Sequence, residues 1–497
     1  MISYLGISLT VCAFLLGWLS WKNFQKGNYK LAVFLLVLIG LLLRVYTASD
    51  FFLHPWDERY HALVAKNMLE HPFIPTLYEN PVLPYDPTNW VGNHVWLHKQ
   101  PLPLWGMMSS IAVFGANEIA IRIPSILLSI IGICLTYRIG RKLFNRNVGY
   151  YAAALYAING HVIEMASGRI ATDHIDIFFL FFIQLGIVLA IDFAQKKQLI
   201  FNVLCGVAIG LAILSKWLPA LIVLPIWGAL LIHSKRFSWK EFIGYGFVLV
   251  LTIFAVAFPW QYYIHTTFPV EAGWEAAFNV KHIYSVLDHQ SGPFYYHFEM
   301  MRINYGEIIY LPLGWFTYKT VFKTKDWKYW SLLMWILIPY IFFTIVATKM
   351  QGYTLLSTPA IFIISGLFFH YLSVNRSRFN YRWIPIVVMV LLFVLPIRFA
   401  FERVKPFTQI DRNPEWQAKM IEFTEHLPKD VRVVVFNVDT PIEMMFYSNA
   451  TVYRIVPEPS VIDSLIDDGY HVYINGNPPA EDSIKGVTYI NLPSKPH

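Results

Sequence analysis

The stretch LAVFLLVLIGLLLRVYTA, residues 31–48, is an apolar run long enough to cross a bilayer as a helix. The segment HPWDER, residues 54–59, follows soon after and sets Asp57 and Glu58 beside Arg59. Charges close to a membrane carry a desolvation cost that an ordinary loop need not bear. Two interpretations are open. Asp57 is a catalytic base that the other helices serve, or the two acids cap the N-terminus of a surface helix that runs to Glu70.

Composition points to a membrane protein with several spans. Of the 497 residues, 56% are hydrophobic and only 14% are charged, and the mean hydropathy is +0.46. The net charge of +7 does not indicate a nucleic-acid partner, because the basic residues lie in short loops between apolar runs. Cys12, Cys134 and Cys205 all fall within apolar segments, so we expect neither a disulfide framework nor a thiolate metal site.

Apolar runs of roughly 17 to 22 residues predict a polytopic α-helical fold with twelve transmembrane helices. The predicted spans are residues 2–21, 31–48, 118–138, 148–166, 175–194, 199–214, 218–233, 242–263, 306–322, 330–347, 354–372 and 383–400. Lys and Arg crowd alternate loops, which the positive-inside rule assigns to the cytoplasm. Both chain ends and two long loops, 49–117 and 264–305, are then expected outside.

The composition changes after Ala400. Residues 431–436, 451–456, 471–474 and 487–491 have the pattern of strands, and residues 414–426, 441–447 and 460–468 have that of helices. Strands that alternate with helices predict a small α/β domain. We therefore expect a transmembrane domain over 1–400 and a soluble extracytoplasmic domain over 401–497, with a lid, acceptor-docking or structural role.

Several basic residues lie in the predicted outward loops, against the usual preference. Lys99, Lys216 and Lys349 occur in three separate outward loops, and Arg169 stands near Asp173 in a fourth. Each lysine alone can be read as a side chain that reaches the interface from an apolar surface. Together they favour an anionic partner held at the outer surface.

These residues occur within an ordered set of short motifs. The motifs are LLLR (41–44), the double acid at 57–58, KQPLPLW (99–105), AIRIPS (120–125), RIATDH (169–174), LAILSK (211–216), and Thr348-Lys349 with Tyr353 ahead of Pro359. The set resembles the polyprenyl-phosphate-sugar-dependent glycosyltransferases of the GT-C class. That branch holds the protein O-mannosyltransferases and the lipid A aminoarabinose transferase. The resemblance covers roughly residues 31–372 and departs from the family at Gln100, where a second proline is usual, and in an extra N-terminal span.

The resemblance implies an inverting glycosyltransferase with a polyprenyl-phosphate sugar donor and a lipid or protein acceptor. An inverting transfer needs a base near the attacking hydroxyl and positive charge where the phosphate leaves. Asp57 corresponds to the family's catalytic acid, and Glu58 and Asp173 are neighbours that could position it or the sugar. The candidate phosphate-binding and substrate-binding residues are Arg44, Lys99, Arg169, Lys216, Lys349 and Tyr353. The resemblance implies an inner (plasma) membrane protein of a bacterium with its site facing outward.

Histidines in the two long outward loops raise the question of a divalent metal. His98 and His282 are the first candidate ligands for a metal shared by the two loops. Their spacing forms no recognised ligand motif, so ordinary polar loop residues are the other interpretation. The sequence identifies no other cofactor.

Two other functions remain open. A polytopic lipid flippase or transporter would also place charges within a membrane, but no paired spans broken by Gly or Pro occur in two matching halves. An oligosaccharide ligase that acts on a lipid-linked glycan needs the same base and phosphate clamp. The sugar and the acceptor cannot be read from the sequence.

Overall fold

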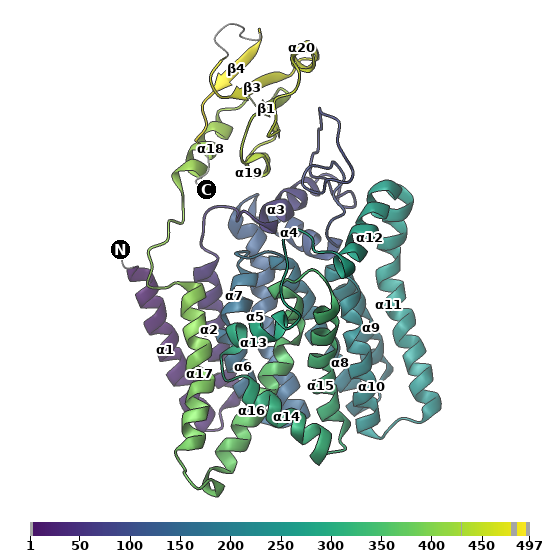
Figure 1. Cartoon of the computed structure of the whole chain (residues 1–497), viewed down its shortest axis with the longest axis vertical. Coiled ribbons are helices and arrows are strands. Elements are labelled where there is room, and N and C mark those ends of the chain that lie inside the picture. The colour runs from purple at the N-terminus through teal and green to yellow at the C-terminus, as the bar shows by residue number, and fades with distance from the viewer. Residues whose placement is uncertain (1–2, 429, 479–484, 494–497) are drawn as a thin grey trace. The chain divides into compact units, whose positions relative to one another are not determined.

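The computed structural model describes residues 3–428, 430–478 and 485–493 (Figure 1). The chain forms two compact units. Unit 1 comprises Met1–Ala48, Ser125–Pro269 and Glu275–Gln409. Unit 2 comprises Ser49–Pro124, Val270–Trp274 and Ile410–His497. Residues 49–124 of the first long loop therefore belong to the same unit as the C-terminal part of the chain. The chain passes from unit 1 into unit 2 for the last time after Gln409.

Unit 1 is helical in its described residues. Its elements are α1 (Tyr4–Gln25), α2 (Tyr29–Thr47), α5 (Glu118–Leu143, which begins in unit 2), α6 (Arg146–Ile158), α7 (Gly160–Ala166), α8 (Asp173–Lys196), α9 (Leu199–Lys216), η1 (Leu218–Ile222), α10 (Val223–Ser234), α11 (Trp239–Thr267), α12 (Pro269–Tyr284, which crosses the second segment of unit 2), α13 (Tyr296–Tyr305), α14 (Tyr310–Tyr318), η2 (Lys319–Lys323), α15 (Trp327–Ile345), η3 (Gln351–Ser357), α16 (Thr358–Val374), η4 (Arg376–Arg378) and α17 (Ile384–Val404). In the core of unit 1, α8 packs on α9 and α10, and α6 packs on α16 and α2.

Nine helical segments in the described part of the chain are long and apolar enough to cross a membrane, and each coincides with a predicted span. The other three predicted spans form shorter helices. Residues 148–166 break at Asn159, which ends α6 and whose side chain accepts the first-turn N–H of Val162 in α7. Residues 218–233 start as a single tight turn at Pro219, and α14 ends at Tyr318 in the wider turn η2. The chain is an integral membrane protein with multiple spans.

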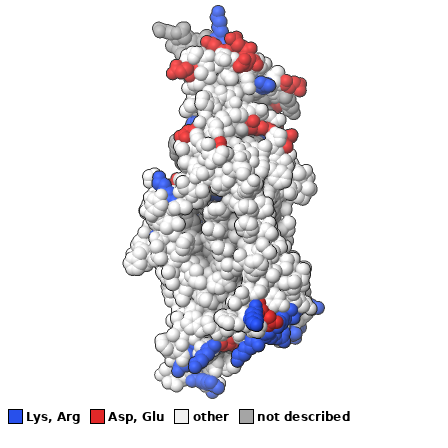
Figure 2. Space-filling view, turned by 90° about the vertical axis from the view of Figure 1, so that its right-hand side faces the viewer, with Lys and Arg blue, Asp and Glu red and all other residues white. Residues whose placement is uncertain are grey.

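The basic residues of unit 1 are concentrated at one end of its helices. Figure 2 shows Lys and Arg side chains gathered over the end that carries the loops after α8, α10 and α14, with an almost uncharged helical surface beside it. The basic residues of those loops include Lys197, Arg236 and Lys325. A band without charges between charged ends is what a bilayer requires.

Unit 2 contains a four-stranded parallel sheet in the order β2-β1-β3-β4. The strands are β1 (Val433–Phe436), β2 (Thr451–Val452), β3 (His471–Asn475) and β4 (Val487–Ile490), and the helices are α3 (Asp57–Asn67), α4 (Pro101–Phe114), α18 (Glu415–Glu425), α19 (Pro441–Tyr447) and α20 (Pro459–Asp467). The prediction of a small C-terminal α/β fold is confirmed. β2 is shorter than predicted because only two of its residues pair with β1.

Helix α3 joins the first loop to the sheet within unit 2. Its side chains Tyr60, Leu63 and Val64 are buried in the same apolar cluster as Val434 of β1, and α19 packs against α3. Burial of such side chains is the main source of stability in a water-soluble core. The position of the first residue of α3 is therefore fixed by a packed core rather than by a loop.

Candidate active site

Asp57 is the first residue of α3, so its carboxylate lies at the positive end of the helix dipole. Its side chain is 15% exposed, and Lys99 Nζ lies 3.4 Å from its Oδ2. Lys99 directly precedes Gln100, the residue at the N-cap position of α4. A helix thus begins at the double acid as predicted, but it ends at Asn67 and most of its side chains are buried. Its first residue is an accessible acid beside a cation. Two of the predicted site residues, Asp57 and Lys99, are brought together.

Glu58 has a different environment from its neighbour, because it is completely buried. One of its oxygens accepts from Arg122 Nε at 2.7 Å, and the other from Arg122 Nη2 at 2.8 Å and from the backbone N–H of His54 at 2.7 Å. His54 also contacts Glu58 at 2.6 Å and Asp50 at 3.2 Å through its two ring nitrogens. Arg412 donates to Asp50 at 2.9 Å. Glu58 therefore fixes the start of α3 rather than facing a substrate.

His54 is the titratable centre of this network. Burial alone would lower the pKa of His54, but the carboxylates of Glu58 and Asp50 outweigh burial and raise the pKa above its ordinary value. The charged imidazole is therefore favoured in the folded protein.

The raised pKa of His54 predicts a stability that falls as pH rises. A group whose pKa is raised on folding stabilises the protein fully below its unfolded pKa, about 6.5, and loses that contribution as pH rises through the higher folded pKa. We expect the midpoint of thermal unfolding to decrease as the pH rises above about 6.5. A His54→Gln variant should show a smaller fall over the same range, and equal falls would contradict the role of His54.

In unit 1, the predicted outward motif around Asp173 forms the turn between α7 and α8. Asp173 is fully buried, and its carboxylate accepts from the backbone N–H of His174. Arg169 donates to the backbone carbonyl of Arg403 at 3.4 Å. Thr172 has a left-handed backbone with φ of 64°, which is uncommon for a β-branched residue and costs energy that the surroundings must offset. The turn is held in an unusual conformation beside an acid.

The same turn contains an acid that the sequence prediction missed. Asp176 lies in the first turn of α8, where it accepts from Thr172 Oγ1 and forms an ion pair with Lys216 Nζ. Lys216 also lies over the ring of Tyr353, 5.4 Å from its centroid. Lys216 therefore has an anionic partner within the protein itself. The sequence did contain a signal for this residue, because Asp176 is a charged side chain within an otherwise apolar run.

Two other predicted phosphate-binding residues are held by backbone carbonyls in unit 1. Lys349 donates to Phe343, Thr344 and Val346 at 3.0, 2.6 and 2.5 Å, which uses its three donors and caps the C-terminus of α15. The Arg44 guanidinium donates to Ser129 Oγ at 2.7 Å and to the backbone carbonyls of Gly40 and Ala157 at 3.0 and 3.1 Å. Arg44 is fully buried among helices, so both residues have structural contacts that account for their positions.

The ion pair between Lys216 and Asp176 predicts a folding defect in Lys216→Ala. Asp176 is buried, and removal of one partner from a buried pair costs about 3–5 kcal/mol because the other charge stays uncompensated. We expect a lower midpoint of thermal unfolding in Lys216→Ala and partial recovery in Lys216→Ala/Asp176→Asn. The rescued double variant then tests ligand binding: normal affinity for polyprenyl phosphate would assign Lys216 to structure alone.

Neither metal candidate is part of a metal-binding cluster. The described residues contain no group of three or more His, Cys, Asp or Glu side chains that could hold a metal ion. His98, in unit 2, stacks on Trp90 with ring centroids 4.4 Å apart, and His282, in unit 1, lies edge-on to Phe278 at 5.1 Å. Each histidine therefore has an aromatic neighbour, and a shared metal stays a prediction.

Comparison with known proteins agrees with the motifs. Residues 98–263 match the family described as dolichyl-phosphate-mannose-protein mannosyltransferase. The chain is similar to this family over these residues, which make up about a third of its length. The predicted resemblance to GT-C glycosyltransferases is therefore confirmed, and the family match includes Lys99, Asp173 and Lys216.

Two related sequences extend the similarity. An uncharacterized protein of Aquifex aeolicus is 27% identical over 378 residues, which cover 74% of this chain and 70% of that protein. An undecaprenyl phosphate-alpha-4-amino-4-deoxy-L-arabinose arabinosyl transferase of Pseudomonas aeruginosa is 29% identical over 191 residues, 36% of this chain. The matched part spans 33% of that enzyme's length.

Solved structures share the fold of this chain. ArnT from Cupriavidus metallidurans bound to undecaprenyl phosphate superposes with a TM-score of 0.61 at 16% identity and covers 87% of this chain and 90% of its own. The oligosaccharyltransferase AglB from Archaeoglobus fulgidus, in complex with an inhibitory peptide and a dolichol-phosphate, gives a TM-score of 0.55 at 13% identity. It covers 85% of this chain and 64% of its own.

Proposed function

We propose that the protein is an inverting glycosyltransferase that moves a sugar from a polyprenyl-phosphate donor to a hydroxyl of a lipid or protein acceptor. Its place is a bacterial inner membrane, with the reaction at the outer face. The family match over residues 98–263 and the undecaprenyl phosphate and dolichol-phosphate named for the solved relatives support the donor class. The lipid-soluble tail of such a donor also suits a chain with many spans.

Asp57 is the proposed general base. It takes the proton of the acceptor hydroxyl while the acceptor oxygen forms a bond to the anomeric carbon of the sugar. The bond from that carbon to the phosphate oxygen breaks on the opposite face, and polyprenyl phosphate leaves with the bonding electrons. Attack opposite the leaving group inverts the configuration at the anomeric carbon. Base catalysis requires the acid within hydrogen-bond reach of the hydroxyl, which an accessible side chain permits.

The contrast between Asp57 and Glu58 carries the proposal. Asp57 is partly exposed beside Lys99, whereas Glu58 is fully buried in bonds to Arg122 and His54. A base must reach its substrate, and its supporting residues must hold it in a fixed direction. Asp57 has the exposure of a base, and Glu58 has the contacts of a positioning residue.

Lys99, which lies beside Asp57 in unit 2, is the proposed partner of the leaving phosphate, and Lys216 of unit 1 remains a candidate phosphate contact. Both lysines are partly exposed, at 17% and 21% of their side chains, whereas the Lys349 ammonium is occupied by carbonyls. Positive charge near the leaving oxygen stabilises the charge that develops there. Arg169 and Tyr353 remain candidate donor contacts, and Asp173 remains the candidate acid should Asp57 not be the base.

Mass spectrometry of whole cells tests the substrate classes. Lipids and glycoproteins from cells with and without the gene should differ by one sugar on one acceptor class, with the unused polyprenyl-phosphate sugar accumulating in the deletion. A complementing copy should restore the profile, whereas a copy with Asp57→Asn should not. Identical lipid and glycoprotein profiles in all strains would contradict the proposal.

A further inference from the structure

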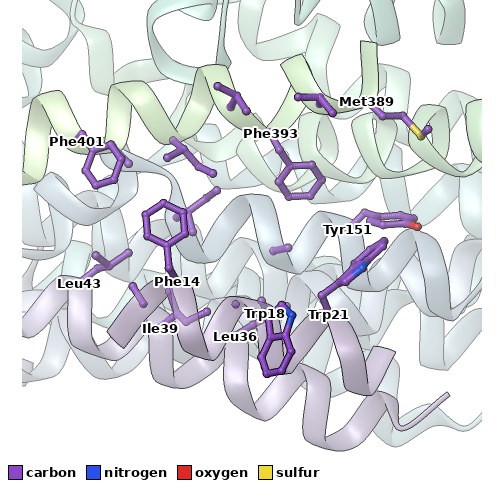
Figure 3. A pocket seen from close by; sticks show the side chains of 18 of the residues that line it. Phe14, Trp18, Trp21, Leu36, Ile39, Leu43, Tyr151, Met389, Phe393 and Phe401 are labelled. Carbon is purple, nitrogen blue, oxygen red and sulfur yellow. The ribbon is translucent and has the colours of Figure 1, made fainter. Parts of the chain in front are cut away.

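A large apolar cavity lies inside unit 1, between α1, α2, α6, α16 and α17. Its volume is about 730 Å³, within the range of roughly 300–1,000 Å³ that small-molecule sites occupy. Figure 3 shows Phe401, Phe393 and Met389 on one side, facing Phe14 and Trp18 on the other. Protein interiors are close-packed and leave few voids larger than a water molecule, so we expect a space of this size to hold a ligand.

The cavity opens sideways toward the surface of the helices. Phe14 and Trp18 both line it, and each is 57% exposed. Helix α1 packs on α2, whereas α17 packs on α7 and α16, which leaves the space between α1 and α17. In a membrane protein this opening faces hydrocarbon rather than water. An apolar chain from the bilayer is therefore the chemistry that fits the cavity.

Basic residues lie close in the chain to the residues that line one end of the cavity. Trp18 and Trp21 line the cavity near the end of α1, and Lys22 lies over the Trp18 ring at 5.7 Å from its centroid. Ser373 and Ile386 line the same end, and the chain between them carries Arg376, Arg378 and Arg382. The segments that continue from this end of the cavity are therefore rich in cations.

Among the described residues, the cations at this end lack the carboxylate partners that some basic residues of neighbouring loops have. Arg138 and Lys142 pair with Asp192 at 2.7 and 2.6 Å, and Lys197 pairs with Glu241 at 2.7 Å. Lys328 lies 3.3 Å from Asp326. Within the described part of the chain, by contrast, no acidic side chain pairs with the cations at the cavity, which are Lys22, Lys26, Arg376, Arg378 and Arg382. An anion from outside the protein would complement them.

We propose that this cavity and its basic end bind an anionic phospholipid of the bilayer. One acyl chain fills the space between α1 and α17, and the phosphate lies against Lys22, Arg376 and Arg382. Basic pockets between membrane helices bind acidic lipid headgroups by this combination of apolar and electrostatic contacts. The site contains neither Asp57 nor Lys99 and does not depend on the proposed sugar transfer.

Photo-crosslinking of the unaltered full-length protein tests the acyl-chain position. Protein in nanodiscs receives phosphatidylglycerol with a diazirine on its acyl chain, and labelled peptides are identified by mass spectrometry. We expect labels concentrated on α1 and α17 around Phe14 and Phe393. Equal labelling of all exposed helices would overturn the proposal. Loss of the label on addition of polyprenyl phosphate, but not of unlabelled phosphatidylglycerol, would assign the cavity to the donor and also overturn it.

A variant that fills the cavity adds a second test. A Cβ at Gly17 meets nothing nearer than Ile39 Cδ1 at 3.9 Å, so Gly17→Phe extends into the space that the acyl chain would use. We expect Gly17→Phe to lose the crosslink and the phosphatidylglycerol that co-purifies with the protein. The matched control is Gly244→Phe on α11, where a Cβ meets nothing within 4 Å and the residue does not line the cavity. Unchanged lipid retention in a folded Gly17→Phe protein would contradict the site.

The basic end is tested by charge removal. The triple variant Lys22→Gln/Arg376→Gln/Arg382→Gln should lower the preference for phosphatidylglycerol over phosphatidylcholine by roughly tenfold or more, while an acyl chain still binds. The control triple variant Lys240→Gln/Lys323→Gln/Lys325→Gln removes the same charge from other loops and should keep the preference. An equal loss of the phosphatidylglycerol preference in both triple variants would show that only the net charge of the protein matters. That result would overturn the headgroup assignment.

Discussion

Asp57→Asn should lower the rate of sugar transfer by about 10²–10⁴-fold, because base catalysis contributes that much and an amide cannot accept the hydroxyl proton. Asn keeps the size of Asp and can still begin α3, so the fold should persist. The measurement is the initial rate of transfer by purified protein in nanodiscs, together with binding of the donor. We expect the rate to fall while donor binding remains close to that of the parent.

The control for Asp57→Asn is Asp86→Asn. Asp86 is an exposed acid of the same unit whose carboxylate accepts from Thr88 in a turn, so the same chemical change there should leave the rate unaltered. Glu58→Gln should act mainly on stability, since Glu58 is buried away from solvent. Near-parental transfer by Asp57→Asn would make Asp57 only the first residue of a helix, and Asp173 would then be the leading candidate.

Arg122→Met should destabilise the folded protein by about 3–5 kcal/mol, because it leaves the buried carboxylate of Glu58 without its main partner. Both side chains of this pair are completely buried, so water cannot compensate for the loss. The expected result is a large fall in the midpoint of thermal unfolding and faster proteolysis of residues 49–124. The measurement is thermal unfolding of the purified protein at fixed lipid content.

The double variant Arg122→Met/Glu58→Met separates charge from shape. Replacement of both members of a buried ion pair by apolar side chains is often close to neutral, so we expect the double variant to recover much of the stability. Arg302→Met breaks an exposed ion pair with Glu299 and should change little. A double variant as unstable as Arg122→Met alone would show that packing, rather than the buried charge, sets the cost.

The local features of this fold could be predicted from the sequence. Long apolar runs such as 31–48 identify helices because the bilayer fixes their length and composition. The alternation of strands and helices after residue 430 gave the correct class for the C-terminal part of the chain. Helix interruptions were harder to predict, because Asn159 breaks residues 148–166 through a single cap inside an apolar stretch.

The partners of the charged residues could not be predicted, because they lie far apart in the chain. Arg122 reaches Glu58 across 64 positions, and Asp176 reaches Lys216 across 40. A lone sequence contains the charges but not their pairing. For the same reason the sequence could not show that the Lys349 ammonium contacts three carbonyls at the end of α15.

The most direct test of the central claim is the anomeric configuration of the product. Purified protein in nanodiscs would receive a series of polyprenyl-phosphate sugars of known configuration with candidate lipid and peptide acceptors, and products would be analysed by nuclear magnetic resonance. We predict one glycoside of inverted configuration, an equal amount of free polyprenyl phosphate, and neither product with Asp57→Asn. A product of retained configuration, or transfer that persists in Asp57→Asn, would contradict the account.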